Sequence, residues 1–200
     1  MVVRQGLQVI LVGAMSAIIC MLRGVNVGGH NKIKMDALRA LLESLKLKSP
    51  QTYVQSGNVV FLSEEKNLTA LSKRIQDAIE RKFGFRPDIA LRAVADLKRV
   101  IVKNPFAKRE GIEPDKLLVC FLSGEPSKTA REDLSKLDTR GEELHFHGSE
   151  LYIYFKNGMG KTKLSWKGVD KAISCSSTGR NWNTVTKLLE MAEALDEAGE

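Results

Sequence analysis

Short apolar runs alternate with stretches in which apolar residues recur every three or four positions, and this pattern predicts strands alternating with helices. Residues 17–23 form a nearly continuous apolar run that ends at Gly24, as expected for a buried strand. The predicted strands are 17–23, 52–55, 58–62, 87–92, 116–122, 143–147, 151–155 and 174–178. The predicted helices are 35–46, 67–83, 93–104, 127–137, 163–173 and 181–195.

Local signals mark the ends of several of these elements. Ser56-Gly57 separates two strand patterns and predicts a hairpin turn. Gly84 stands where a glycine commonly ends a helix, and Ser127 is a candidate N-cap. Pro50 is expected to close the first strand–helix unit before the hairpin begins.

The predicted elements follow the order β-α-β-β-α-β twice, which is the ferredoxin-like arrangement. We therefore predict an α+β protein with two tandem ferredoxin-like halves and a C-terminal helix. The first half with its connecting helix covers residues 15–104, a polar linker covers 105–115, and the second half with its C-terminal helix covers 116–200. Residues 1–14 are expected to be an N-terminal extension, because Met15 directly precedes the first domain strand and the apolar run lacks a signal-peptide cleavage site.

Composition narrows the class of protein and of partner. With 43% hydrophobic and 28% charged residues, the chain belongs to neither the disordered nor the fibrous class. A formal net charge of +7 favours polyanionic partners such as nucleic acid or nucleotides, although a solvated basic surface explains it equally well. We expect no membrane partner, since the N-terminal apolar run is too short for a membrane span.

The three cysteines, Cys20, Cys120 and Cys175, are far apart in the sequence and form no C-x-x-C pair. Neither a disulfide framework nor a zinc site is indicated. Each lies among apolar or small residues, where cysteine packs as a small hydrophobe, and a cytoplasmic location fits this usage best. His145 and His147 share a strand face without a third ligand, so we expect no metal site and no cofactor.

Residues 23–35, reading RGVNVGGHNKIKM, are the most promising stretch for function. Glycines allow backbone N–H groups to approach an oxyanion closely, and the helix that follows adds the positive end of its dipole. Arg23, Lys32 and Lys34 supply positive charge without any acidic neighbour in this stretch. The spacing matches neither a dinucleotide fingerprint nor a P-loop, and a tight strand-to-helix crossover is the alternative interpretation.

Three further stretches carry polar candidates. Residues 158–163 form a second Gly-rich basic loop, which is not a P-loop because Phe155 replaces the first glycine. Residues 176–184 place Arg and Asn beside Trp182, which is either a stacking platform or a core residue. Gln55 and Asn58 flank the first hairpin turn. The candidate ligand-binding residues are Arg23, Asn26, Gly28, Gly29, Asn31, Lys32, Gln55, Asn58, Lys161, Lys163, Arg180 and Asn181.

Four segments, RGVNVGGHNKIKM, YVQSGNVVF, NPF and TGRNWNTVTKLLE, make the chain closely similar to the family catalogued as domain of unknown function 1697. The resemblance covers Met15 to about Ala194. It implies a bacterial, cytosolic protein with two fused ferredoxin-like α+β halves. It transfers no activity and no catalytic role to any residue.

Three functional hypotheses follow from the sequence. The first is binding of a phosphate-bearing ligand, nucleic acid or a nucleotide, through the basic Gly-rich loops. The second is a small-molecule enzyme that acts on an anionic substrate in the cleft between the halves. The third is a structural or oligomeric interaction module. The first leads because basic charge and Gly-rich loops coincide, although the aromatic strand of RNA-recognition domains is missing.

Overall fold

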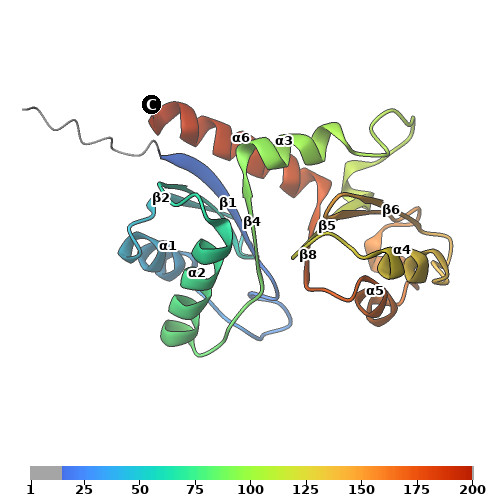
Figure 1. Cartoon of the computed structure of the whole chain (residues 1–200), viewed down its shortest axis with the longest axis horizontal. Helices are drawn as coiled ribbons and strands as arrows, with labels where there is room; N and C mark the ends of the chain where they lie inside the picture. The colour runs from blue at the N-terminus through green and yellow to red at the C-terminus, as the bar shows by residue number, and fades with distance from the viewer. Residues whose placement is uncertain (1–14, 200) are drawn as a thin grey trace, which may run out of the picture.

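Two four-stranded antiparallel sheets, each built from consecutive segments of the chain, lie side by side in the computed structural model, which describes residues 15–199 (Figure 1). The predicted extension, residues 1–14, lies outside the described residues. The strand orders are β2-β3-β1-β4 and β6-β7-β5-β8. The predicted α+β class is confirmed.

The first half contains β1 (Ser16–Leu22), α1 (Met35–Ser44), β2 (Lys48–Tyr53), β3 (Asn58–Ser63), α2 (Leu68–Phe83), β4 (Ile89–Ala93) and α3 (Val94–Val102). The second half contains β5 (Leu117–Leu122), α4 (Lys128–Ser135), β6 (Glu143–His147), β7 (Glu150–Tyr154), α5 (Trp166–Ile173), β8 (Ser177–Asn181) and α6 (Trp182–Gly199). Two 3-10 turns, η1 (Pro114–Lys116) and η2 (Met159–Lys161), precede β5 and α5. Both helix-end signals are confirmed: Gly84 adopts a left-handed conformation after α2, and the Ser127 hydroxyl accepts a hydrogen bond from Ala130 N.

Three element predictions were wrong. The strand predicted at 52–55 is β2, which runs from Lys48 to Tyr53 and ends before the turn. Pro50 does not close a unit but lies inside β2, an edge strand whose register shifts between Lys48 and Gln51. An edge position with a register irregularity tolerates proline, because the missing N–H need not join the ladder. The last strand was predicted at 174–178, whereas β8 covers Ser177–Asn181. Its residues are small or polar, and pairing with β5 rather than local preference makes them a strand.

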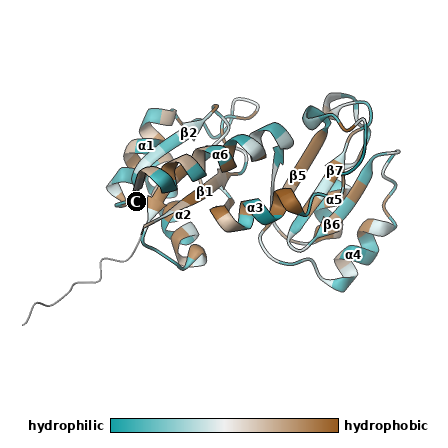
Figure 2. Ribbon diagram, turned by 90° about the horizontal axis from the view of Figure 1, so that it is seen from above, coloured by the Kyte–Doolittle hydropathy of each residue, from teal (hydrophilic) through white to brown (hydrophobic). Residues whose placement is uncertain are grey.

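Three apolar clusters fill the molecule, and one of them is shared by both halves. Each half has its own cluster between its sheet and two helices. The shared cluster lies between the inner faces of both sheets and the helices α3 and α6. α6 leaves β8 in the second half and crosses to contact β1 and β3 of the first half (Figure 1). Seen from above, α6 passes beside the apolar strand β1, and the apolar strand β5 lies in view next to α3 (Figure 2).

The segment predicted as a linker, residues 105–115, contributes to this shared core. Its Phe106 side chain is only 2% exposed and packs against Tyr154, with ring centroids 5.7 Å apart. Tyr152 of β7 donates a hydrogen bond of 2.7 Å to the Val100 carbonyl at the end of α3. The halves are therefore joined by packed side chains as well as by the chain itself.

The strand registers show that two arginines occupy equivalent positions in the two halves. In the first sheet, Arg92 of β4 pairs with Ile19 of β1. In the second sheet, Arg180 of β8 pairs with Val119 of β5. β4 and β8 are edge strands of their sheets and contact each other. Each arginine is therefore placed to reach from its own half into the other.

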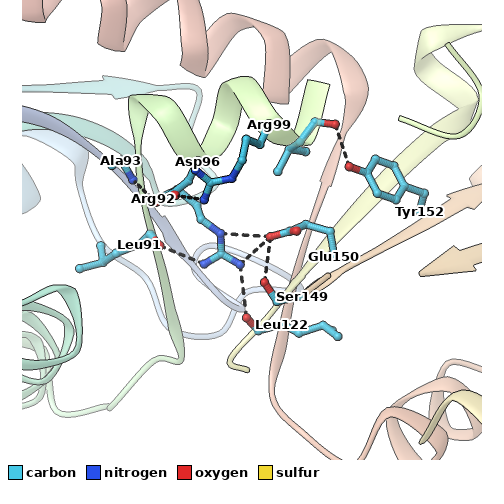
Figure 3. Close-up of polar contacts among 10 residues, drawn as sticks. Leu91, Arg92, Ala93, Asp96, Arg99, Leu122, Ser149, Glu150 and Tyr152 are labelled. Atoms are coloured by element: carbon cyan, nitrogen blue, oxygen red, sulfur yellow. Dashed lines mark hydrogen bonds and ion pairs between the residues drawn. The ribbon is translucent and has the colours of Figure 1, made fainter. Parts of the chain in front are cut away.

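Arg92 crosses into the second half (Figure 3). Its Nε and Nη2 both donate to Oε1 of Glu150, at 3.2 and 2.9 Å, and Nη2 also lies 3.4 Å from the Leu122 carbonyl. Its Nη1 donates to the Leu91 carbonyl at 2.9 Å. Both side chains of the ion pair are largely buried, 15% and 13% exposed. The charge of Arg92 is thus matched by a carboxylate.

Arg180 makes the reciprocal crossing into the first half. Its Nη2 donates to the carbonyls of Leu22 at 2.7 Å and Ser56 at 3.2 Å, and its Nε donates to Oδ1 of Asn58. Its Nη1 donates to the Gly179 carbonyl at 2.8 Å, as Arg92 does to its own preceding carbonyl. Asn58 takes the place that Glu150 has in the other half. Among residues 15–199, Arg180 consequently has neutral acceptors and no carboxylate partner within 4.0 Å.

Two of the three cysteines are fully packed among apolar side chains, as predicted. Burial raises the pKa of Cys20 and of Cys120 to about 12, whereas Cys175 is partly exposed. Because the thiolate is the reactive form, we expect only the Cys175 thiol to react with Ellman's reagent in the native protein at pH 8. Absorbance should give about one thiol per native chain and three after denaturation. Rapid reaction of two thiols in the native state would contradict this assignment.

Candidate functional site

The loop between β1 and α1 is shaped by the side chain of Asn26, which adopts a positive φ of 56°. Its Nδ2 donates to the carbonyls of Ile33 at 2.9 Å and Gln55 at 2.8 Å, and its Oδ1 accepts from Ile33 N at 2.9 Å. These bonds fasten the loop to the β2–β3 turn. Asn26 therefore acts on backbone groups, and its amide is already fully engaged.

A tight turn at the tip of the loop explains its glycines. Gly28 and Gly29 have φ values of 58° and 81°, a region that favours glycine. Asn31 closes the turn, since its carbonyl accepts from Asn26 N at 3.2 Å and its Nδ2 donates to the Gly24 carbonyl at 3.2 Å. The polar side chains of Asn26 and Asn31 hold the loop, and the lysines beside them remain on its surface.

A hollow of about 710 Å³ opens where this loop meets the start of α1. We call it the loop hollow; its lining residues are Asn26, Gly29, Lys32, Ile33, Lys34, Met35, Asp36 and Gln55. Lys32 and Lys34 are exposed there. Lys34 is the N-cap of α1 and makes no side-chain capping bond, so the first turn of α1 presents its N–H groups without a capping oxygen. The Asp36 carboxylate is bound by Arg39.

Arg23 is placed differently from the loop lysines. Its guanidinium forms ion pairs with Asp88 at 3.8 Å and with Asp170 of α5 at 3.3 Å. These side chains are 41–47% exposed, so each pair contributes little to stability. Both carboxylates nevertheless offset its charge, and Arg23 does not line the loop hollow.

The remaining predicted residues divide into two groups. Asn58 is fully buried; its Nδ2 donates to Ser56 Oγ at 2.9 Å, and its Oδ1 accepts from Arg180. Asn181 caps α6 by accepting from Thr184 N at 2.9 Å. Lys161 and Lys163 are exposed near the start of α5 and line neither of the two cavities described here. The structure therefore gathers Asn26, Gly29, Lys32 and Gln55 of the predicted set in one hollow.

The lining residues of a larger cavity, the inter-half cleft, were not predicted from the sequence. The cleft has a volume of about 790 Å³ and is walled by α2, β4 and α3 on one side and by the ends of β5, β7 and β8 on the other. Its charged lining residues are Lys73, Arg86, Asp88, Arg92, Asp96, Arg99, Lys103 and Glu150. Because they come from several distant elements, no motif in the sequence marks them.

Two further findings concern metal binding and membrane crossing. Within residues 15–199, no three His, Cys, Asp or Glu side chains come together in a way that could hold a metal ion. Within the same residues, no helix has both the length and the apolar character needed to cross a membrane.

Sequence comparison places the protein in a family. The model of the family described as "Protein of unknown function (DUF1697)" matches residues 15–152. The chain belongs to this family. The match begins at Met15, where the sequence pattern placed the start of the first domain. No curated protein sequence matches the chain significantly.

A solved structure with a similar fold supports this assignment of the fold. The conserved bacterial protein SP0830 from Streptococcus pneumoniae superposes with a TM-score of 0.70 and 22% sequence identity. The match covers 90% of this chain and 99% of the other. At this identity the likeness concerns the fold alone.

Proposed function

We propose that the protein binds a phosphate-bearing ligand, a nucleotide or nucleic acid, in the loop hollow. The observation that supports this is the placement of Lys32 and Lys34 beside the uncapped start of α1. The N-terminal end of a helix carries partial positive charge, and its free N–H groups suit phosphate oxygens. Two lysines at this end oppose the helix dipole, and an anion bound between them offsets that cost.

The polar surroundings fit the same ligand. Gly29 brings backbone close to the hollow without a side chain, and Gln55 adds an amide from the β2–β3 turn. The single carboxylate of the lining, Asp36, is bound by Arg39, which limits its repulsion of an anion. The volume of about 710 Å³ lies within the range of roughly 300–1,000 Å³ that is usual for small-molecule sites.

Removing both loop lysines should weaken binding. We expect the Lys32→Gln/Lys34→Gln variant to bind ATP about tenfold more weakly than the wild type, because two charge-assisted contacts are lost. Isothermal titration calorimetry at low salt measures this change. Anisotropy titrations of a labelled single-stranded oligonucleotide at several salt concentrations then separate the two ligand classes. For nucleic acid, the salt dependence of affinity should also become shallower in this variant.

Lys108→Gln/Lys128→Gln is the matched control, because both lysines are exposed and line neither cavity. It removes the same formal charge without touching the loop hollow. Equal affinities of the two double variants for both ligands would reduce the binding to a general effect of net charge and refute the loop hollow as the site.

We also propose that each half is a ferredoxin-like unit. Support comes from the element order β-α-β-β-α-β in both halves and from their matching strand orders, β2-β3-β1-β4 and β6-β7-β5-β8. A cytoplasmic location and a bacterial origin remain expectations of the family resemblance.

A further inference from the structure

The two halves differ at one pair of equivalent positions beside the inter-half cleft. Arg23 N donates to the Asp88 carbonyl at 2.8 Å, and Ser123 N donates to the Ser176 carbonyl at 2.9 Å. These contacts join equivalent positions, one residue beyond β1 and one beyond β5. In the first half the two side chains form an ion pair of 3.8 Å. In the second half they are two short hydroxyls, and both line the cleft.

The charges around the cleft favour an anion. Its three lining carboxylates are all engaged by arginine: Glu150 by Arg92, Asp96 by Arg99, and Asp88 by Arg23. Lys73 and Lys103 also line the cleft, and within residues 15–199 neither has a carboxylate within 4.0 Å in an ion pair. The lining thus holds five Lys or Arg side chains against three carboxylates, although one of the five, Arg86, is paired with Asp77 and Glu80 outside the lining.

Two of the cations lie close together on one element. Arg99 and Lys103 are four residues apart at the end of α3, a spacing that places them on the same face. The Arg99 side chain is 69% exposed although it pairs with Asp96, so part of its guanidinium remains accessible to a ligand in solution. Two neighbouring cationic side chains can form charge-assisted hydrogen bonds with a phosphate group.

The rest of the lining suits hydroxyl groups rather than a base. Its small polar residues are Thr69, Ser72, Ser123, Ser149 and Ser176. The one Phe, Tyr or Trp among the lining residues is Tyr152, which is fully buried and donates its hydroxyl hydrogen to a backbone carbonyl. Nucleobases are commonly held by stacking on aromatic rings, and the one exposed ring in the lining is the imidazole of His147, which is smaller than the ring system of Phe, Tyr or Trp side chains that lead such sites.

We propose that the inter-half cleft binds a small phosphorylated sugar or polyol. Arg99 and Lys103 hold its phosphate, and the hydroxyls of Ser123 and Ser176 bond to those of the ligand. Ser149 donates its hydroxyl hydrogen to Oε1 of Glu150 at 3.3 Å and offers the ligand its oxygen as an acceptor. The largely buried pair of Arg92 and Glu150 also lines the cleft (Figure 3). The cleft shares no residue with the loop hollow, so this proposal stands or falls independently of the proposed function.

The sharpest test transfers the ion pair of the first half into the cleft. The Ser123→Arg/Ser176→Asp variant copies Arg23 and Asp88, keeps the net charge and removes two hydroxyls. We expect wild-type protein to bind glucose 6-phosphate with a Kd below about 1 mM in calorimetry, and this variant to bind at least about tenfold more weakly. Glucose and inorganic phosphate should each bind the wild type at least about tenfold more weakly than glucose 6-phosphate.

A second variant tests the same site in case the first variant does not fold. Arg99→Gln/Lys103→Gln changes exposed side chains and should also reduce affinity for glucose 6-phosphate about tenfold, while Lys108→Gln/Lys128→Gln leaves it unchanged. Absence of heat with glucose 6-phosphate up to about 10 mM would overturn the proposal. Equal affinity for AMP would overturn the choice of a polyol, and equal binding by all variants would overturn the location.

Discussion

Replacement of Arg180 with alanine is expected to lower the free energy of unfolding by about 3 kcal/mol. The guanidinium bonds to the carbonyls of Leu22 and Ser56 and to the Asn58 side chain, so its removal strips several oxygens of their donor. Asn58 is fully buried, and water cannot easily replace the lost donor. Urea denaturation should show a lower midpoint, and the melting temperature should fall by about 6–12 °C.

Arg180→Lys tests whether geometry or charge is responsible. Burial lowers the pKa of Arg180 to about 10, so the native side chain is still charged at neutral pH, as lysine is in solution. An ammonium cannot reach all of these acceptors from one position, because the planar fork of arginine is lost. We expect this variant to lose about half as much stability as Arg180→Ala. An Arg180→Ala variant as stable as the wild type would show that the contacts between the halves do not depend on this residue.

The order of elements could be predicted from the sequence because local signals agreed with the periodicity. Gly84, with its left-handed backbone, and Ser127, with its capping hydroxyl, are read from their nearest neighbours alone. β8 could not be predicted in the right place. Its residues have weak strand preference, and they become a strand because β5 lies beside them. The same holds for Pro50, whose position at a sheet edge is a tertiary property.

The loop hollow was predictable in part. Composition located the basic Gly-rich loop, and the structure brings Lys32 and Gln55 to one hollow although 23 positions separate them in the sequence. The composition did not show which polar groups are free. The Asn26 amide is hydrogen-bonded to backbone groups, and Arg23 forms ion pairs with two carboxylates from distant segments. Whether a polar group is bonded within the protein or left free for a ligand depends on the fold.

The role of Arg180 and the inter-half cleft depend on how the two halves meet. Equivalent positions of the repeat carry Asn58 in one half and Glu150 in the other, which leaves one crossing arginine without a carboxylate. A comparison of the halves by strand register reveals this difference, whereas a search for motifs does not. Register assignment requires knowledge of which residues pair, and the sequence pattern supplies only approximate strand bounds.

Gly57→Ala is expected to be the most damaging change at any glycine between residues 15 and 199, lowering the free energy of unfolding by about 3–4 kcal/mol. A Cβ at this position would lie 2.8 Å from Leu22 Cβ and 3.3 Å from Val25 Cβ. Both neighbours are Cβ atoms of buried residues and cannot rotate away. The φ of 74° adds backbone strain for any residue other than glycine. Chemical denaturation measures the loss.

Gly84→Ala separates the two contributions to this loss. Gly84 has nearly the same φ, 78°, but an added Cβ there meets no atom within 4 Å. Its cost should be the backbone strain alone, about 1 kcal/mol. The difference between the two variants therefore measures the close approach of the β2–β3 turn to the end of β1. Because the Gly57 carbonyl accepts from Leu22 N at 2.8 Å, a shift of this turn would also move the Leu22 carbonyl that Arg180 binds. Equal losses in both variants would mean that the turn relaxes freely and that the contact of the two halves does not fix its position.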